Sequence, residues 1–224
     1  KTIYNYLDMG LFLNISVKDL PVKKIVRKKK TQKSKVSLNN RTGRSIEKRP
    51  VDILNRDKFG HWEMDTVVSG QNTGKSCLLV LSERMTRQEI LIKIKNKTSF
   101  SVVRALNALE RKMGARSFRE TFKTITCDNG VEFLDSNGIE KSRYNKTSRT
   151  ILYYCHPYSS YERGTNENIN RMIRRHFPKG TNFDEVNTKQ INMVQDWINN
   201  YPRKILGGIS SNDFLKTLIA VDTL

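Results

Sequence analysis

The chain has 224 residues, enough for one sizeable hydrophobic core, and 41 Lys and Arg against 22 Asp and Glu give it a formal net charge of +19. This charge favours a polyanionic partner, although ribosomal and basic membrane-surface proteins share it. No segment has the apolar run of a transmembrane helix or a signal peptide, so we expect a cytoplasmic protein with no membrane partner. The chain begins at Lys1 rather than Met, and we interpret it as a fragment or a processed chain.

The positive charge is concentrated in residues 1–56, whose net charge is +11. Thr2–Gly10 reads as the tail of a helix that ends at Gly10, and Lys23–Arg49 has no sustained apolar period, which predicts a mobile basic linker. Within this linker we expect three consecutive residues to bind DNA phosphates: Lys28, Lys29 and Lys30. A solvated tail without specific contacts is the alternative. The folded domain is therefore predicted to span residues 57–224.

Three strands open the predicted domain: His61–Val68, Ser76–Ser82 and Gln88–Ile94. The connections between them are short and rich in turn residues, which predicts an antiparallel meander. Helical spacing of apolar residues follows in Ser99–Met113, and Gly114 would end that helix. The remaining predicted elements are a strand at Thr124–Cys127, a strand at Thr150–Tyr154, a helix after residue 162, a helix at Thr188–Tyr201 and a helix at Asn212–Leu218.

This order predicts a mixed α/β sheet in which a strand meander feeds a crossover to further strands. The three cysteines, Cys77, Cys127 and Cys155, are far apart and fall in or beside predicted strands. We expect them to be reduced residues of the core rather than a disulfide or a zinc site.

Acidic residues are scarce in this basic chain, and two of them lie on or directly after predicted strands. Asp65 falls within the first strand, where an acid on a half-buried face needs a partner or a cation; a solvent-facing position is the alternative. Asp128 ends the fourth strand, where ligand-binding groups gather in α/β sheets; an Asx turn with Gly130 is the alternative. Glu132 and Asp135 are further acids nearby.

A third acid, Glu167, lies on the helix that follows the fifth predicted strand. Helical geometry gives this helix a polar face around Glu167 and an apolar stripe of Ile169, Met172, Ile173 and His176. The alternative role of Glu167 is an ordinary helical carboxylate paired with a neighbouring arginine. Several polar residues of this helix are candidates for phosphate contacts, with helix solubility as their alternative role: Arg163, Asn166, Asn170, Arg171 and Arg174.

In a folded sheet, Asp65, Asp128 and Glu167 can converge on one edge. Three clustered carboxylates repel one another unless divalent cations neutralise them, and oxygen ligands select Mg²⁺ or Mn²⁺. Two such ions support in-line displacement at phosphorus, which predicts cleavage of phosphodiester bonds or strand transfer.

The order of several motifs resembles the insertion-sequence-thirty family of bacterial DDE transposases. The matching blocks are Gly60–Asp65, Thr126–Phe133, Pro157–Tyr158, Arg163–Asn168, Phe177–Thr181 and Pro202–Leu206. The resemblance implies an RNase H-like catalytic core with a five-stranded mixed sheet, and Asp65, Asp128 and Glu167 as the catalytic, metal-binding triad. It also implies that residues 1–56 hold the end of a helix-turn-helix region, and that the protein acts as a homo-oligomer on transposon ends and target DNA.

Two departures from the family pattern stand out. Tyr161-Glu162 occupies a place where the family often has Trp-Gln, and Asn137–Ser148 reads as an insertion that lengthens the spacing between Asp128 and Glu167. The function that we expect is Mg²⁺-dependent DNA cleavage and strand transfer at insertion-sequence ends. A non-catalytic DNA-binding remnant of a transposase and an RNase H-like nuclease are the alternatives.

Overall fold

The structure is a computed structural model that describes residues 2–16, 19, 43–71, 73–157 and 164–221. It divides into two compact units, residues 1–36 and 37–224. In the first unit, helix α1 spans Thr2–Asp8, and the Gly10 N–H donates to the Leu7 carbonyl with a positive φ of 69° at Gly10. The predicted helix tail and its glycine stop are therefore confirmed. Lys28, Lys29, Lys30 and most of the predicted linker lie outside the described residues.

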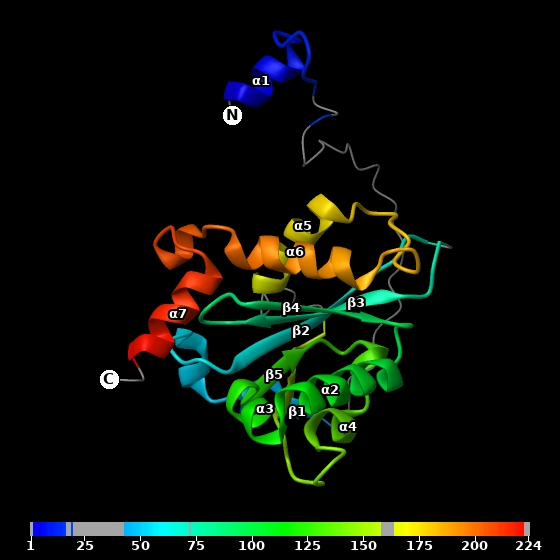
Figure 1. The fold of residues 1–224 in the computed structure, drawn as a ribbon, viewed down its shortest axis with the longest axis vertical. Coiled ribbons are helices and arrows are strands. Elements are labelled where there is room, and N and C mark those ends of the chain that lie inside the picture. The colour runs from blue at the N-terminus through cyan, green and yellow to red at the C-terminus, as the bar shows by residue number, and fades with distance from the viewer. Residues whose placement is uncertain (1, 17–18, 20–42, 72, 158–163, 222–224) are drawn as a thin grey trace. The chain divides into compact units, whose positions relative to one another are not determined.

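The second unit is built on a mixed sheet of six strands in the order β1-β6-β5-β2-β3-β4 (Figure 1). The strands are β1 (Arg44–Ser45), β2 (His61–Val68), β3 (Cys77–Glu83), β4 (Glu89–Ile94), β5 (Thr124–Cys127) and β6 (Ile151–Tyr154). β2, β3 and β4 form the predicted antiparallel meander, whereas β5 is parallel to β2, β6 to β5 and β1 to β6. This is the RNase H-like arrangement that the sequence resemblance implied.

The sheet has one strand more than the five that were expected. The additional strand β1 pairs Arg44 with Tyr153 and Ser45 with Tyr154, in a segment assigned from sequence to the mobile linker. Arg49, at the end of that linker assignment, is buried and donates to the Thr126 hydroxyl over 3.1 Å. A two-residue polar strand has no side-chain periodicity, so the sequence pattern did not reveal it.

Helices cover both faces of the sheet (Figure 1). One face carries α2 (Ser99–Met113), α3 (Ala115–Thr121) and α4 (Ser136–Glu140), and the other carries α5 (Gly164–His176) and α6 (Thr188–Asn200), with α7 (Ser211–Val221) following α6. Short 3-10 helices lie at Ile46–Lys48, Val51–Asn55, Val131–Phe133 and Lys204–Leu206. No helix among the described residues is long and apolar enough to cross a membrane. Helices α3 and α4 were not expected from the sequence.

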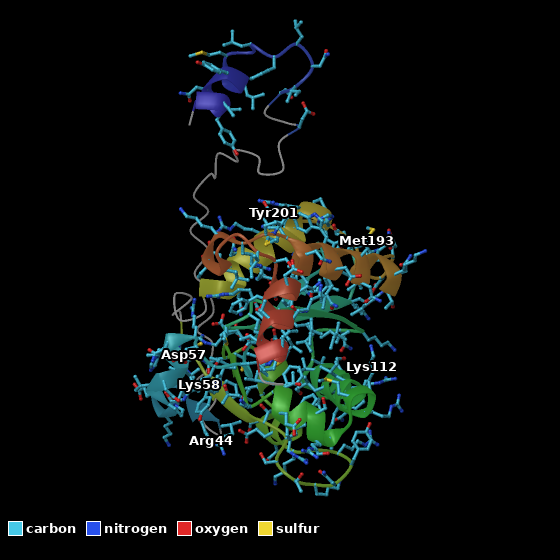
Figure 2. All side chains as sticks on the ribbon, turned by 60° about the vertical axis from the view of Figure 1, so that its left-hand side comes forward. Arg44, Asp57, Lys58, Lys112, Met193 and Tyr201 are labelled. Carbon is cyan, nitrogen blue, oxygen red and sulfur yellow. The ribbon has the colours of Figure 1, made fainter. Side chains whose placement is uncertain are left out.

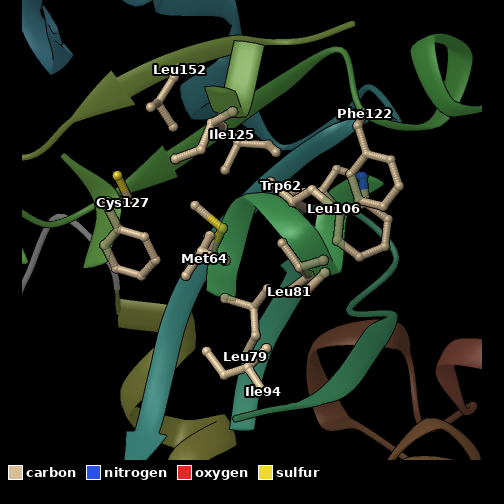
Figure 3. Packing of buried hydrophobic residues seen from close by; sticks show 14 of the residues in the cluster. Trp62, Met64, Leu79, Leu81, Ile94, Leu106, Phe122, Ile125, Cys127 and Leu152 are labelled. Carbon is tan, nitrogen blue, oxygen red and sulfur yellow. The ribbon is translucent and has the colours of Figure 1, made fainter. Parts of the chain in front are cut away.

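The alternation of side chains along β2 and β5 divides the core into two clusters. Trp62, Met64, Ile125 and Cys127 point toward α2 and α3, where they pack against residues such as Phe122 (Figure 3). On the opposite face Val67, Leu78 and Val80 pack against Ile169 and Ile173 of α5 and against Ile198 of α6. The apolar stripe predicted for α5 is thus confirmed except at His176, which is exposed.

The three cysteines are buried free thiols, as expected for residues of the core. Burial raises the pKa of Cys77 to about 11, which keeps this thiol protonated and unreactive at neutral pH.

The predicted insertion Asn137–Ser148 forms most of α4 and a short antiparallel bridge between Lys141 and Ser148. The buried side chain of Arg149 holds it in place. This guanidinium donates to the carbonyls of Gly138 and Ile139 and to Glu110 of α2 over 2.7 to 2.9 Å. The insertion is therefore tied to the α2 layer at its end, directly before β6.

Candidate active site

Asp65 lies on the face of β2 that α5 covers, because it alternates with Met64, which points into the α2 layer. Its Oδ2 accepts a hydrogen bond of 2.9 Å from the side-chain amide of Asn170 on α5, and its Oδ1 accepts one of 2.8 Å from the Thr66 N–H. The carboxylate is thus half-buried between a strand and a helix, rather than on an open solvent face.

Asp128 follows β5 directly, two residues beyond the last observed pair of the β2–β5 ladder. β2 and β5 are parallel, with Glu63 beside Thr126, so that extending this pairing by two residues brings Asp65 beside Asp128. Neighbouring strands are about 4.8 Å apart. The Asp128 Oδ1 accepts from the Gly130 N–H over 2.9 Å, so the Asx turn considered as its alternative role is present and orients the carboxylate.

Glu167 lies in the first turn of α5 and is exposed. It precedes Asn170 by three residues, and residues with this spacing have Cβ atoms about 5–6 Å apart on one side of a helix. α5 is fixed along β2 by two contacts, Asn170 with Asp65 and the Arg174 guanidinium with the Val68 carbonyl over 2.9 Å. Glu167 is therefore carried to the vicinity of Asp65 by the docking of its helix.

The three carboxylates are not gathered into one cluster. Within the described part of the chain, no group of three or more His, Cys, Asp and Glu side chains has an arrangement suited to a metal ion. The structure brings together Asp65, the loop of Asp128 and the helix of Glu167, but not all three carboxylate groups.

Two buried oxygens near these carboxylates, one on each face of β2, are nevertheless of the chemical kind that binds a divalent cation. Asn170 Oδ1 and Glu132 Oε2 are buried oxygens without a hydrogen-bond partner among the described residues. The first belongs to the amide that contacts Asp65. The second is close to Asp128, because a Cβ placed on Gly130 would lie 2.5 Å from Glu132 Oε2 and 2.9 Å from Asp128 Oδ1. Oxygen donors of this kind are the ligands of Mg²⁺ and Mn²⁺.

Glu132 was indicated by the sequence only as an alternative to Asp128. It is almost fully buried, and its Oε1 accepts from the Thr66 hydroxyl over 2.7 Å and lies 3.2 Å from the Lys97 ammonium. Thr66 alternates with Asp65 and so faces the α2 layer, which means that Glu132 links the Asp128 loop to β2 on the face opposite Asp65. The signal in the sequence was its position four residues after Asp128, within the motif that carries the resemblance.

Glu63 shares the site face of β2 but has a different role. It is fully buried and forms an ion pair with Arg84, which is itself almost fully buried. A buried carboxylate neutralised by an arginine is a structural group. Of the two acids on this face of the strand, Asp65 is therefore the candidate for the site.

The predicted phosphate-binding residues of α5 have different environments. Arg171 is exposed and donates a long hydrogen bond of 3.4 Å to the side-chain oxygen of Asn168. Asn166 is buried and Asn170 contacts Asp65. Arg174 donates to the carbonyls of Val68, Phe177 and Pro178, and burial lowers its pKa. Arg163 lies outside the described residues. The structure therefore presents Arg171 to solvent and ties Arg174 to the backbone.

Comparisons with known proteins give a consistent set of relatives. The chain is 40% identical over 210 residues to a probable transposase for the insertion-like sequence element IS1161 of Streptococcus salivarius, covering 92% of this chain and 55% of that protein. It is 37% identical over 175 residues to the transposase for IS4351 of Bacteroides fragilis, covering 78% of this chain and 50% of the relative.

A third relative, the transposase InsI for IS30A of Escherichia coli, is 34% identical over 170 residues, covering 76% of this chain and 41% of that protein. No protein-family model matches. The chain thus spans about half the length of the curated relatives it matches.

Proposed function

Because this chain belongs to the IS30 family of insertion-sequence transposases, we propose that its sheet unit cleaves DNA strands at insertion-sequence ends and joins the freed 3′-hydroxyl to a target. The observation that carries the proposal is the contact between Asn170 and Asp65. It docks the helix of Glu167 onto the strand pair of Asp65 and Asp128.

In the first step, the oxygen of a water molecule attacks phosphorus, the bond to the 3′-oxygen breaks, and the 3′-oxygen leaves with a proton as a hydroxyl. In the second step, this 3′-hydroxyl attacks a target phosphate, loses its proton and displaces the target's own 3′-oxygen. When bound, two Mg²⁺ or Mn²⁺ ions would activate the attacking oxygen and stabilise the leaving oxygen.

The residues proposed to hold these ions are Asp65, Asp128 and Glu167. The Thr66 N–H and the Asn170 amide fix the two oxygens of Asp65, and the Gly130 N–H fixes Asp128. These hydrogen bonds set the orientation of both strand carboxylates before DNA binds. Glu167 supplies the third carboxylate from the exposed side of α5.

The test is a nicking assay on a supercoiled plasmid that carries the element's own ends, with Mg²⁺. Asp65→Asn, Asp128→Asn and Glu167→Gln should each lower the rate by far more than about tenfold, because each removes a charged ligand. The exposed Asp196 on α6 supplies the matched control Asp196→Asn, which should cleave like the wild type. A loss of tenfold or less in the nicking rate of these three variants would contradict the proposed mechanism.

A second candidate, DNA binding without catalysis, is favoured by the absence of a three-residue metal cluster among the described residues. Titration of Mg²⁺ or Mn²⁺ by calorimetry separates the two. Saturable binding that weakens in Asp65→Asn supports the enzyme, and no binding supports the remnant. An RNase H-like nuclease would instead cleave an RNA·DNA hybrid faster than a DNA duplex.

We also propose that the protein acts as a homo-oligomer, because one reaction must hold two element ends.

A further inference from the structure

A cationic pocket lies beside α5, next to the proposed active site but separate from its carboxylates. Its cavity volume is about 560 Å³, and its lining comes from α5, from Arg56 and Arg87, and from the segment Tyr201–Ile205. Arg203 and Lys204 belong to the motif Pro202–Leu206 singled out in the sequence. Among the described residues the lining contains five cationic side chains and no acidic one. Such a concave surface suits an anion.

Arg203 is the central group of this pocket. Only 8% of the residue is exposed, and its Nε has no hydrogen-bond partner among the described residues. Its Nη2 reaches the Ile198 carbonyl at a long 3.4 Å. A buried guanidinium with an unused donor is unfavourable unless a ligand completes its hydrogen bonds.

The charges around the pocket are mutually repulsive. Burial, followed by the positive charge of Arg56, lowers the pKa of Arg87 to about 10, and Arg203 acts in the same direction. Burial lowers the pKa of Arg203, with Glu89 acting in the opposite direction, and burial raises the pKa of Glu89 and so favours its neutral form. An anion in the pocket would relieve this repulsion, and a phosphate offers the geometry that guanidinium groups bind best.

The position of the pocket relates it to the proposed chemistry. Its α5 residues are Asn168, Met172 and Arg175, which share one side of the helix, and Asn168 directly follows Glu167. The apolar parts of Met172, Tyr201 and Ile205 provide surface against which a sugar can pack. We propose that the pocket binds one backbone phosphate, with its sugar, of the DNA strand that passes Glu167. This inference rests on the proposed function and assigns a role to the Pro202–Leu206 motif.

The first test measures affinity for a fluorescent DNA duplex in EDTA, so that no catalysis is involved. Arg175→Ala and Lys204→Ala remove exposed side chains, and each should reduce the slope of log Kd against log salt by about one. The matched controls are Arg111→Ala and Lys112→Ala on α2, on the other side of the sheet from Tyr201 (Figure 2). Equal effects in pocket and control variants would overturn the proposal.

The second test places a neutral methylphosphonate at each phosphate in turn. At one position the affinity difference between the wild type and Arg175→Ala should vanish, because the charge that Arg175 contacts is already gone. If the difference persists at every position, the pocket binds no single phosphate. The Arg203→Gln variant, accompanied by a urea unfolding curve, should show the same position-specific loss.

These outcomes are distinct from those of the nicking assay. If the wild type fails to cleave but the pocket variants still lower the salt slope relative to their controls, the proposed function fails and the phosphate pocket stands. If the wild type cleaves and the pocket variants bind DNA as tightly as the wild type, the pocket proposal alone fails.

Discussion

The side-chain amide of Asn170 on α5 donates a hydrogen bond of 2.9 Å to Oδ2 of Asp65 on β2, a residue 105 positions earlier in the chain. This contact joins the helix of Glu167 to the central strand of the sheet. It also fixes one oxygen of the carboxylate that we propose to hold a cation, so the residue has a positioning role.

Asn170→Ala should lower DNA cleavage by about 10–100-fold, because a hydrogen bond to a charged group contributes roughly 1.5–3 kcal/mol. The Mg²⁺ concentration needed for half-maximal cleavage should rise as Asp65 loses its fixed orientation. Cleavage measured across a Mg²⁺ series checks both effects. The exposed Asn192 on α6 gives the control Asn192→Ala, and a Mg²⁺ dependence unchanged in Asn170→Ala would refute the positioning role.

Two replacements of Glu132, by Ala and by Gln, should destabilise the fold to different extents. Glu132→Ala leaves the half-buried Thr66 hydroxyl without its acceptor and should cost about 1–3 kcal/mol in the free energy of unfolding. Glu132→Gln keeps an acceptor at that position and loses only the contact with half-exposed Lys97, so it should cost less. Urea unfolding measures both, with exposed Glu185→Ala as the control. Equal losses in the two Glu132 variants would contradict this account.

The stability of the protein should depend on pH through Glu89. This residue is fully buried on β4, where it accepts from the Ser82 hydroxyl over 2.6 Å, and burial raises its pKa well above 4.5. Between 4.5 and the raised pKa, the folded state binds a proton that the unfolded state has released, so Glu89 makes the free energy of unfolding fall as pH rises.

Glu89→Gln removes this titration. Between pH 5 and pH 8 its free energy of unfolding should therefore fall by less than that of the wild type. Urea unfolding at the two pH values measures it. The exposed Glu120 provides the control Glu120→Gln, which should follow the wild type. Parallel curves for Glu89→Gln and the wild type would mean that Glu89 is ionised in the folded protein.

Arg149→Ala should cost about 3–5 kcal/mol in the free energy of unfolding, because it leaves the buried carboxylate of Glu110 without its partner. It also removes the bonds to the carbonyls of Gly138 and Ile139, so limited proteolysis should cut within Asn137–Ser148. Arg143, an exposed residue of the same insertion, supplies the control Arg143→Ala, which should stay within about 0.5 kcal/mol of the wild type. Resistance to proteolysis in Arg149→Ala would show that other contacts hold the insertion.

The meander and the central helices were predictable because their periodicities are strong. His61–Val68 and Thr124–Cys127 match the observed strands residue for residue, as does Ser99–Met113 the helix α2. Helix α3 escaped prediction because its seven residues contain one fully buried apolar side chain, Phe118. Such elements are held by tertiary packing rather than by a local pattern.

The candidate site was predictable in its positions but not in its contacts. The order of motifs indicated Asp65, Asp128 and Glu167, and the register of β2 with β5 aligns the first two. The roles of Asn170 and Glu132 depend on hydrogen bonds between residues 105 and 66 positions apart. No local pattern encodes such pairs. Burial of Arg203 likewise became visible only once α5, Arg87 and the Pro202–Leu206 motif were placed together.

The anchoring of Arg149 to α2 has a consequence for how this chain tolerates change. Because the Arg149 side chain is bonded to α2 two residues before β6 begins, we expect the stretch between Lys141 and Ser148 to tolerate changes in length without a shift of the strand that follows. The number of residues between Asp128 and Glu167 is then a poor guide to whether a related chain shares this fold. The same stretch, around the exposed Tyr144, is a suitable place to attach a label for following DNA binding.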